Sequence, residues 1–277
     1  MRTRVVRRAV LIGLTILMLT GCGRQIAQLP GDDLLAIGPD QTALAAVRPD
    51  YILAAVEAAG GLPTWLQCRR IDLSGVVAAY RPDNSYYLTE HTFTAFPWSE
   101  ALRITAHEPQ AEFTWLMVVD RFELLKGDAN LDVSPLAGAY QNYASAVLQV
   151  VTAPARLLDR RTQLSRQPFT VQIRGRAYDP IDARFRISSS AGAGTDETSR
   201  AAALYWTNGT YYLNRENSLA EMVWLANPLR QDFLIVWGYD YAPVSADGVR
   251  VPTKIEIFRS DAEARIGPRL AKIDLVM

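Results

Sequence analysis

The sequence predicts a mainly β protein with a few helices (α+β), built as a curled antiparallel sheet, or half-barrel, of about ten strands with a helical lid. Three observations lead to this fold class. Apolar and polar residues alternate with a period of two over most of the chain after residue 70, no strand–helix–strand rhythm occurs, and three segments have helical spacing. A sheet of about ten strands must curl, and the helices are the elements available to cover its inner face.

The predicted strands follow one another closely, as in a meander. In the first, at 71–79, apolar side chains alternate with polar or small ones, and the turn at 81–84 leads into the second. The segment 169–177 has the cleanest alternation, and turns are expected at 179–180 (Asp-Pro) and at 208–209 (Asn-Gly). The expected strands are 71–79, 86–96, 102–107, 113–119, 169–177, 185–187, two arms of a hairpin over 204–213, 233–241, 251–259 and 270–276.

Three segments predict helices. Residues 50–59 have helical spacing and stop at a Gly-Gly pair. The longest helix is expected over 134–151, where Ser134 is a suitable N-cap and Pro154 limits the helix. A capping-box pattern at 218–221 predicts a short third helix.

The N-terminus has the three parts of a secretory signal: a basic start, a short apolar core and an exit of small residues. The apolar run is too short to span a bilayer as a stable helix. It closes on Leu19-Thr20-Gly21-Cys22, which closely resembles a bacterial lipoprotein signal. The resemblance implies that Cys22 is acylated, as with palmitate, and becomes the first residue of the mature protein. An ordinary cleaved signal with a stray thiol is the alternative.

Gly23 follows this cysteine. In Gram-negative lipoproteins an Asp at that place favours retention at the inner membrane, so the resemblance implies a cell-envelope protein that is lipid-anchored at the outer membrane and faces the periplasm. We expect residues 1–21 to be the signal peptide, 22–47 a tether and linker, and 48–277 a single half-barrel-like domain.

The composition argues against nucleic-acid binding, and no catalytic motif stands out. Removing residues 1–21 takes away four arginines and no acid, which leaves 25 basic residues against 29 acidic ones. His91 and His107 lie in predicted strands beside acidic neighbours that point to the opposite face, and neither a Gly-x-Ser-x-Gly turn nor a phosphate loop occurs. We therefore expect no enzyme activity, metal site or cofactor, although two distant carboxylates would leave no local mark.

The order of the elements resembles that of the lipoprotein-sorting carriers and receptors of the bacterial envelope, the Lol-type half-barrel group. The segments 60–65 (Gly-Gly-Leu-Pro-Thr-Trp) and 249–255 (Val-Arg-Val-Pro-Thr-Lys-Ile) look like that group. The resemblance covers roughly residue 50 to the end and implies a concave face that binds acyl chains or lipoproteins. No substrate-contacting residue of the carriers matches, so none is carried over.

Large apolar side chains on the predicted strands are candidates for the wall of a ligand cavity, or else fill an ordinary core. The cavity candidates are Trp115, Phe169, Val171, Ile173, Phe185 and Trp237, and the lid candidates are Leu136, Tyr140, Tyr143 and Val147.

A cluster of four arginines over 174–186 either meets anionic head groups or is neutralised by Asp179 and Asp182 nearby.

Three functions are compatible with these patterns. The first is a membrane-anchored envelope lipoprotein that binds acyl chains or lipoprotein cargo non-covalently, with the helix 134–151 as a lid. The second is a structural or assembly component of the envelope with a filled core and a protein partner. The third and least favoured is a hydrolase of lipid or glycan that uses His91 or His107 as its base.

Overall fold

The computed structural model describes residues 32–39, 48–107, 112–118, 121–127, 137–185, 206–228, 230–244 and 248–276. The chain forms two compact units, residues 1–34 and 35–277. The expected signal peptide, Cys22 and most of the expected tether lie outside the described residues. Within the described ranges, no helix is long and apolar enough to cross a membrane.

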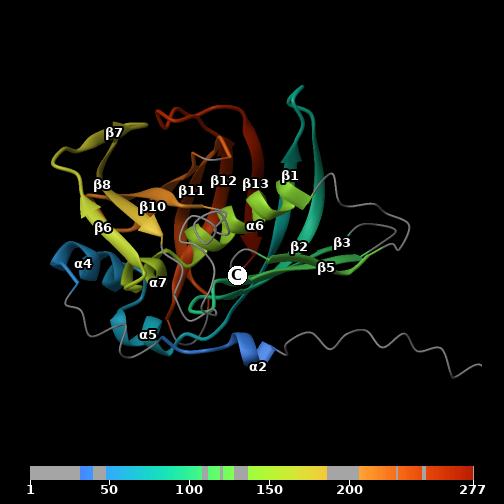
Figure 1. The fold of residues 1–277 in the computed structure, drawn as a ribbon, viewed down its shortest axis with the longest axis horizontal. Helices are drawn as coiled ribbons and strands as arrows, with labels where there is room; N and C mark the ends of the chain where they lie inside the picture. The colour runs from blue at the N-terminus through green and yellow to red at the C-terminus, as the bar shows by residue number, and fades with distance from the viewer. Residues whose placement is uncertain are drawn as a thin grey trace, which may run out of the picture. The chain divides into compact units, whose positions relative to one another are not determined.

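One antiparallel sheet forms the body of the second unit (Figure 1). Its thirteen described strands have the order β5-β4-β3-β2-β1-β13-β12-β11-β10-β9-β8-β6, and β7 pairs with β8. Two meanders, β1 to β5 and β6 to β13, are therefore joined where β13 pairs with β1. The strands are β1 Ile71–Tyr80, β2 Tyr86–Phe96, β3 Ala101–His107, β4 Glu112–Val118, β5 Arg121–Lys126, β6 Thr162–Arg166, β7 Val171–Ile173, β8 Arg176–Phe185, β9 Asn208–Asn214, β10 Ala220–Asn227, β11 Asp232–Pro243, β12 Arg250–Arg259 and β13 Arg269–Val276.

The described helices are α2 Asp32–Leu35, α4 Asp50–Ala58, α5 Leu62–Gln67, α6 Ala137–Val151 and α7 Ala153–Leu158. Helix α6 lies across the inner face of the curled sheet (Figure 1) and contacts β3, β4 and β10 to β12. The short α7 follows it and contacts α4, α5 and β6. The predicted fold class, a curled antiparallel sheet with a few helices, is confirmed, with more strands than the ten expected.

The two faces of the sheet have different cores. Ile71, Leu73 and Val77 of β1 are buried on the inner face, whereas most residues between them are exposed. These inward side chains belong to one large cluster that also includes apolar residues of α4, α6 and α7. A smaller cluster on the outer face of β10 to β12 consists of Met222, Ile235, Trp237 and Phe258.

The segments 60–65 and 249–255 meet at one corner of the structure. The chain turns between α4 and α5 at Gly60, whose φ is 120°, and an added Cβ there would collide with the carbonyl oxygen of Gly248. Trp65 is fully buried and donates its Nε1–H to the oxygen of Ala59 at 3.0 Å. The backbone N–H of Arg250 donates to the same oxygen at 2.9 Å. The corner therefore fastens the first helices to the start of β12.

The predicted strand 169–177 and its turn at 179–180 are wrong. The chain reverses earlier, at Arg174-Gly175, where φ values of 51° and 79° allow a tight hairpin between β7 and β8. Pro180 lies inside β8, and its carbonyl accepts a hydrogen bond from the backbone N–H of Gln167. In an antiparallel strand the N–H and the carbonyl of a residue face the same side. The missing N–H of Pro180 therefore falls between the residues of β8 that pair with β7 and those that pair with β6.

Two further local predictions are wrong. Asn208-Gly209 begins β9 instead of turning a hairpin, and the residues from Ala220 form β10 instead of a helix. The turn between these strands is built on Asn214, whose side chain accepts from the N–H of Glu216, and on Ser218, whose φ is 61°. Pairing of β10 with β9 and β11 overrides the local helix signal.

The remaining differences concern a proline and two short strands. Pro154 lies in the first turn of α7, so it begins a second helix after ending the pattern of the first. The strands β5 and β6 were not predicted. They form the two ends of the sheet order and are rich in charged or polar residues, as edge strands commonly are.

Candidate functional site

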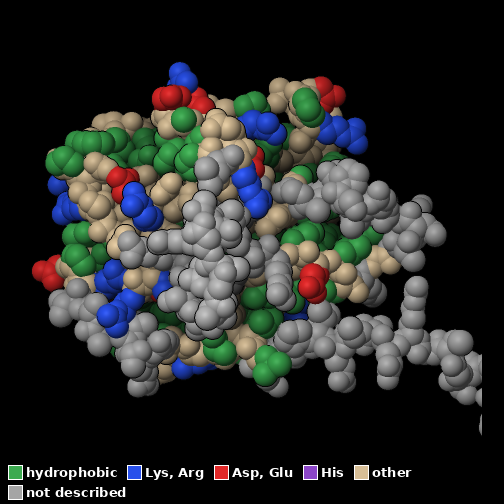
Figure 2. Space-filling view, in the orientation of Figure 1, with side chains coloured by type: hydrophobic (Ala, Val, Ile, Leu, Met, Phe, Trp, Pro, Cys, Tyr) green, Lys and Arg blue, Asp and Glu red, His purple; other side chains and the backbone are tan. Residues whose placement is uncertain are grey.

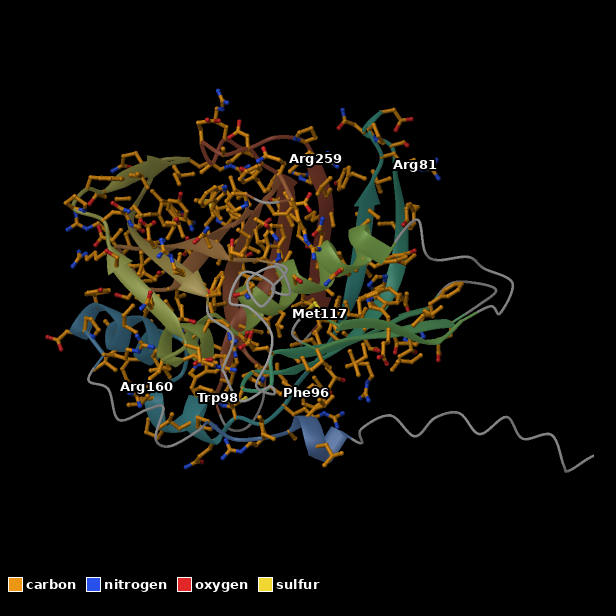
Figure 3. All side chains as sticks on the ribbon, in the orientation of Figure 1. Arg81, Phe96, Trp98, Met117, Arg160 and Arg259 are labelled. Atoms are coloured by element: carbon orange, nitrogen blue, oxygen red, sulfur yellow. The ribbon has the colours of Figure 1, made fainter. Side chains whose placement is uncertain are left out.

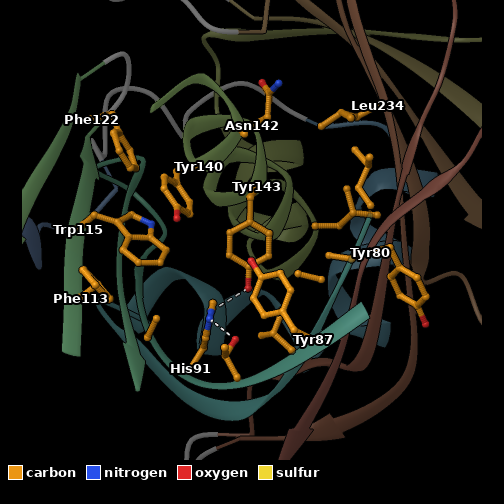
Figure 4. Close-up of a pocket in the computed structure, with 18 of the residues that line it drawn as sticks. Tyr80, Tyr87, His91, Phe113, Trp115, Phe122, Tyr140, Asn142, Tyr143 and Leu234 are labelled. Carbon is orange, nitrogen blue, oxygen red and sulfur yellow. Dashed lines mark hydrogen bonds between the residues drawn. The ribbon is translucent and has the colours of Figure 1, made fainter. Parts of the chain in front are cut away.

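A cavity of about 370 Å³ lies between the inner face of the sheet and the N-terminal half of α6 (Figure 4). Pockets for small ligands typically measure roughly 300–1,000 Å³. The walls come from β1 to β5, from β11 to β13 and from α6. Most lining residues are apolar or aromatic, among them Val77, Ala106, Phe113, Trp115, Phe122, Leu234, Ile257 and Leu270.

The cavity has a buried floor and an exposed rim. Val77, Trp115 and Ile257 are at most 4% exposed and form part of the floor. At the rim, the side chains of Tyr87 and Leu124 are 48% and 37% exposed. An elongated apolar group is therefore able to enter from the rim and lose its contact with water against the floor.

Aromatic rings hold the N-terminal half of α6 above the sheet. The Tyr140 ring lies 5.1 Å from the Trp115 ring on β4 and 6.4 Å from the Phe122 ring on β5, centroid to centroid. Tyr143, one turn later, meets the ring of His91 edge-on at 5.8 Å. Figure 4 shows these rings around the same space. They space the helix from the sheet and leave the cavity between them.

His91 is the polar centre of the floor. It is 8% exposed; its Nε2 lies 2.9 Å from the Thr89 hydroxyl, and its Nδ1 lies 3.1 Å from the Tyr143 hydroxyl. A neutral imidazole has one donor and one acceptor nitrogen, so one hydroxyl accepts and the other donates. Burial, with a smaller effect of the charge on His107, lowers the pKa of His91 from 6.5 to about 4. The bond to Tyr143 thus ties α6 to β2 without placing a charge in the cavity at pH 7.

The pair Thr89–His91 has the spacing of a nucleophile and its base but not the electrostatics. A general base works best when its pKa is near the working pH, and the pKa of His91 lies well below it. Its second nitrogen faces the Tyr143 hydroxyl instead of a carboxylate that would stabilise the imidazolium. The arrangement favours a structural link between α6 and the sheet.

The described part of the chain contains no cluster of possible metal ligands, because no three His, Cys, Asp or Glu side chains come together there. The other histidine, His107, lies 3.4 Å from the carboxylate of Glu112 on the neighbouring strand, and both side chains are about 40% exposed. This pair is a surface contact of the β3–β4 hairpin.

Two buried polar atoms among the lining residues, Trp115 Nε1 and Asn142 Oδ1, have no hydrogen-bond partner in the described part of the chain. Buried donors and acceptors are normally paired. Trp115 Nε1 belongs to the ring that packs against Tyr140. The wall of the cavity is therefore mostly apolar and contains two polar atoms without a described hydrogen-bond partner.

No protein-family model and no curated protein sequence matches the chain. Solved structures to which it is similar include a LolA superfamily protein from Nitrosomonas europaea, 11% identical over 84% of this chain and 93% of that one, with a TM-score of 0.46. A DUF1329 family protein from Desulfovibrio piger is 8% identical over 83% and 92%, with a TM-score of 0.43. A domain from Vibrio parahaemolyticus, titled as an outer membrane lipoprotein-sorting protein, is 9% identical over 75% and 83%, with a TM-score of 0.37.

The structure brings three of the predicted site residues together. Trp115, Tyr140 and Tyr143 all line the cavity. Val147, the next lid candidate, is 1% exposed and belongs to the packed core beyond the cavity. Leu136 lies outside the described residues.

The other predicted cavity residues lie elsewhere. Phe169 is 56% exposed, and Val171 and Ile173 are half-buried in β7. Ile173 packs with Trp237 in the outer cluster, because the hairpin at 174–175 carries β7 to the outer face. A period-two pattern read through this hairpin assigned its first arm to the inner face. Phe185 packs against the inner cluster but does not line the cavity.

Sequence reasoning missed several cavity residues. Tyr87, Thr89 and His91 alternate along β2, and His91 is opposite Gly75, an inward position of β1. The alternation in β2 therefore contained the signal, but none of these residues was named as a cavity candidate. Phe122 was missed because β5 was not predicted.

Two arginines of the cluster meet acids from other strands instead of the expected Asp179 and Asp182. Arg174 stacks over the Trp237 ring at 4.2 Å and lies 3.6 Å from Glu256, while Arg176 lies 3.2 Å from Glu221. Arg186 lies outside the described residues. On the face drawn in Figure 2, basic and acidic side chains of the described residues are interspersed.

Proposed function

We propose that the chain is a membrane-anchored envelope lipoprotein that holds acyl chains non-covalently in the cavity under α6. The observation that carries this proposal is the cavity itself: its floor is buried and apolar, its rim is open, and its one buried histidine is neutral at pH 7. A ligand with a long apolar tail suits such walls better than a polar metabolite does.

Burial of the tail would drive binding. Each buried methylene contributes about 0.8 kcal/mol, so about ten methylenes yield roughly 8 kcal/mol before the loss of ligand freedom is subtracted. The aromatic rings of Trp115, Phe122 and Tyr140 offer the contact surface. The N-terminal half of α6 would act as the lid, since its described links to the sheet include ring contacts and one neutral hydrogen bond.

The anchor is proposed from the sequence. Leu19-Thr20-Gly21-Cys22 would direct acylation of Cys22, and more than one acyl chain makes membrane attachment stable. With Gly23 next, the protein would sit at the outer membrane facing the periplasm, with residues 22–47 as its tether and a single domain from residue 48. Its partners would then be the membrane and lipid or lipoprotein cargo.

The test is uptake of a fluorescent fatty acid and native mass spectrometry of the full chain carrying Cys22→Ser, which cannot be acylated. We expect co-purifying lipid and saturable uptake. Ala106→Phe, which fills the cavity from β3, should abolish uptake; Val76→Phe places the same ring on the outer face and should leave uptake unchanged. Ala271→Leu is a milder filling change should Ala106→Phe prevent folding.

Lipid-free spectra together with no uptake by the Cys22→Ser chain would overturn the proposal. The assembly role with a protein partner would then take its place. Crosslinking in intact cells distinguishes the two, because it should recover a reproducible envelope protein under the assembly role.

A further inference from the structure

Among the described residues that line the cavity, Arg259 is the only one charged at pH 7, since His91 is neutral. It is the last residue of β12. The inward positions before it, Ile255 and Ile257, are buried in the inner cluster, whereas Phe258 between Ile257 and Arg259 belongs to the outer cluster. The strand register therefore aims Arg259 toward the concave side at the end of an apolar row. Figure 3 shows it at the same end of the sheet as Arg81.

The neighbouring arginines of the same hairpin are neutralised, and Arg259 is not. Arg265 lies 2.6 Å from Asp261 and 2.9 Å from Glu263, and Arg269 lies 2.7 Å from Glu256. Within the described part of the chain, Arg259 has no carboxylate within 4 Å. Arg259 is exposed, and it lines the cavity together with the half-buried Leu270.

We propose that the cavity selects anionic amphiphiles, and that Arg259 binds the anionic oxygens of the head group while the tail lies on the apolar floor. This inference rests on the proposed function and adds the ligand class. A planar guanidinium donates two parallel N–H bonds to a carboxylate or a phosphate. Both head groups share this chemistry, so the experiment must separate fatty acids from phosphate-bearing lipids.

Displacement of a neutral fluorescent acyl probe from the full chain with Cys22→Ser provides the test, at pH 8 and low salt. The competitors are dodecanoate, dodecyl phosphate and dodecanol, which share one tail. We expect the two anions to bind about tenfold more tightly than the alcohol. A preference for both anions indicates a site that accepts fatty acids as well as phosphate-bearing lipids, and a preference for the phosphate alone indicates a phosphate-bearing lipid.

Arg259→Gln should remove this preference and leave dodecanol binding unchanged, while Arg259→Lys should retain part of it. Arg265→Gln, in the same hairpin but ion-paired, is the matched control and should behave like the unmodified chain. Equal affinities for all three competitors, or a preference that survives Arg259→Gln, would overturn the inference and leave the acyl-binding function standing. Absence of binding by every probe, dodecanol included, would overturn both.

Discussion

The two halves of α6 meet the same sheet in different ways. In the C-terminal half, Ala144, Ala146 and Leu148 are at most 3% exposed and pack directly on the strands. In the N-terminal half, Tyr140 and Tyr143 are only partly buried and stand over the cavity. Small side chains let a helix approach a sheet closely, whereas large rings keep it away.

The sheet contributes to the same difference. Gly238 on β11 faces the C-terminal half, and an added Cβ would lie 2.8 Å from Val150 Cγ2 and 2.8 Å from Pro252 Cγ. Below the N-terminal half, Trp115 and His91 occupy the corresponding inner surface. One continuous helix therefore serves as a core element at one end and as a cavity cover at the other.

The largest expected contrast is between two leucines, one in each region. Leu148→Ala in the packed half should lower the free energy of unfolding by about 3 kcal/mol, because it leaves a void among close-packed atoms. Leu124→Ala at the cavity rim should cost less than about 1 kcal/mol, because the side chain is already 37% exposed. Urea denaturation of both variants measures the contrast, and equal losses would contradict the division into packed and hollow halves.

The second effect depends on pH. The pKa of His91 is lower in the folded protein, about 4, than its usual 6.5, so the unfolded chain binds the proton more readily. The contribution of neutral His91 to the free energy of unfolding is therefore fully present above pH 6.5 and is lost as the pH falls toward 4. It amounts to about 3 kcal/mol.

Other groups titrate in the same pH range. The effect of His91 is therefore obtained by comparing how the free energy of unfolding depends on pH in the unmodified chain and in His91→Gln. Unfolding free energies at pH 7 and pH 4 should diverge in the unmodified chain more than in the variant. Parallel pH curves for the two would show that His91 is not buried as described.

The smallest expected effect concerns the indole of Trp115. Its N–H has no hydrogen-bond partner, so Trp115→Phe removes no hydrogen bond and should change the free energy of unfolding by less than about 1.5 kcal/mol. Thermal unfolding checks this. A loss of 3 kcal/mol or more would mean that the N–H is bonded in solution.

Much of the fold followed from local patterns. The strand β2 has the predicted bounds, and the strands β11 to β13 differ from prediction by one or two residues at their ends. Prediction failed where a long-range contact outweighs a local signal: 218–221 has the capping box of a helix, yet Glu221 accepts a hydrogen bond from the Tyr178 hydroxyl across the sheet. The positive φ at Arg174 left no sign in the alternation.

The candidate site was predicted less well than the fold. Trp115, Tyr140 and Tyr143 were named as site residues, because inward aromatic residues on strands and a helix stripe are visible in sequence. His91 was named only as a candidate base of the least favoured hydrolase, and Arg259 only as the last residue of a predicted strand. Their roles depend on which partners surround them, and those partners come from distant strands.

The sequence by itself determined the alternation of strands, the antiparallel meander and the central helix, because these depend on side chains within a few residues of one another. It also contains the lipoprotein-like segment that ends at Cys22. Only the tertiary structure decided that β7 folds onto the outer face and that α6 stands away from the sheet at one end. Those features arise from the pairing of strands far apart in the chain and from the volumes of side chains that meet there, and no local pattern encodes either.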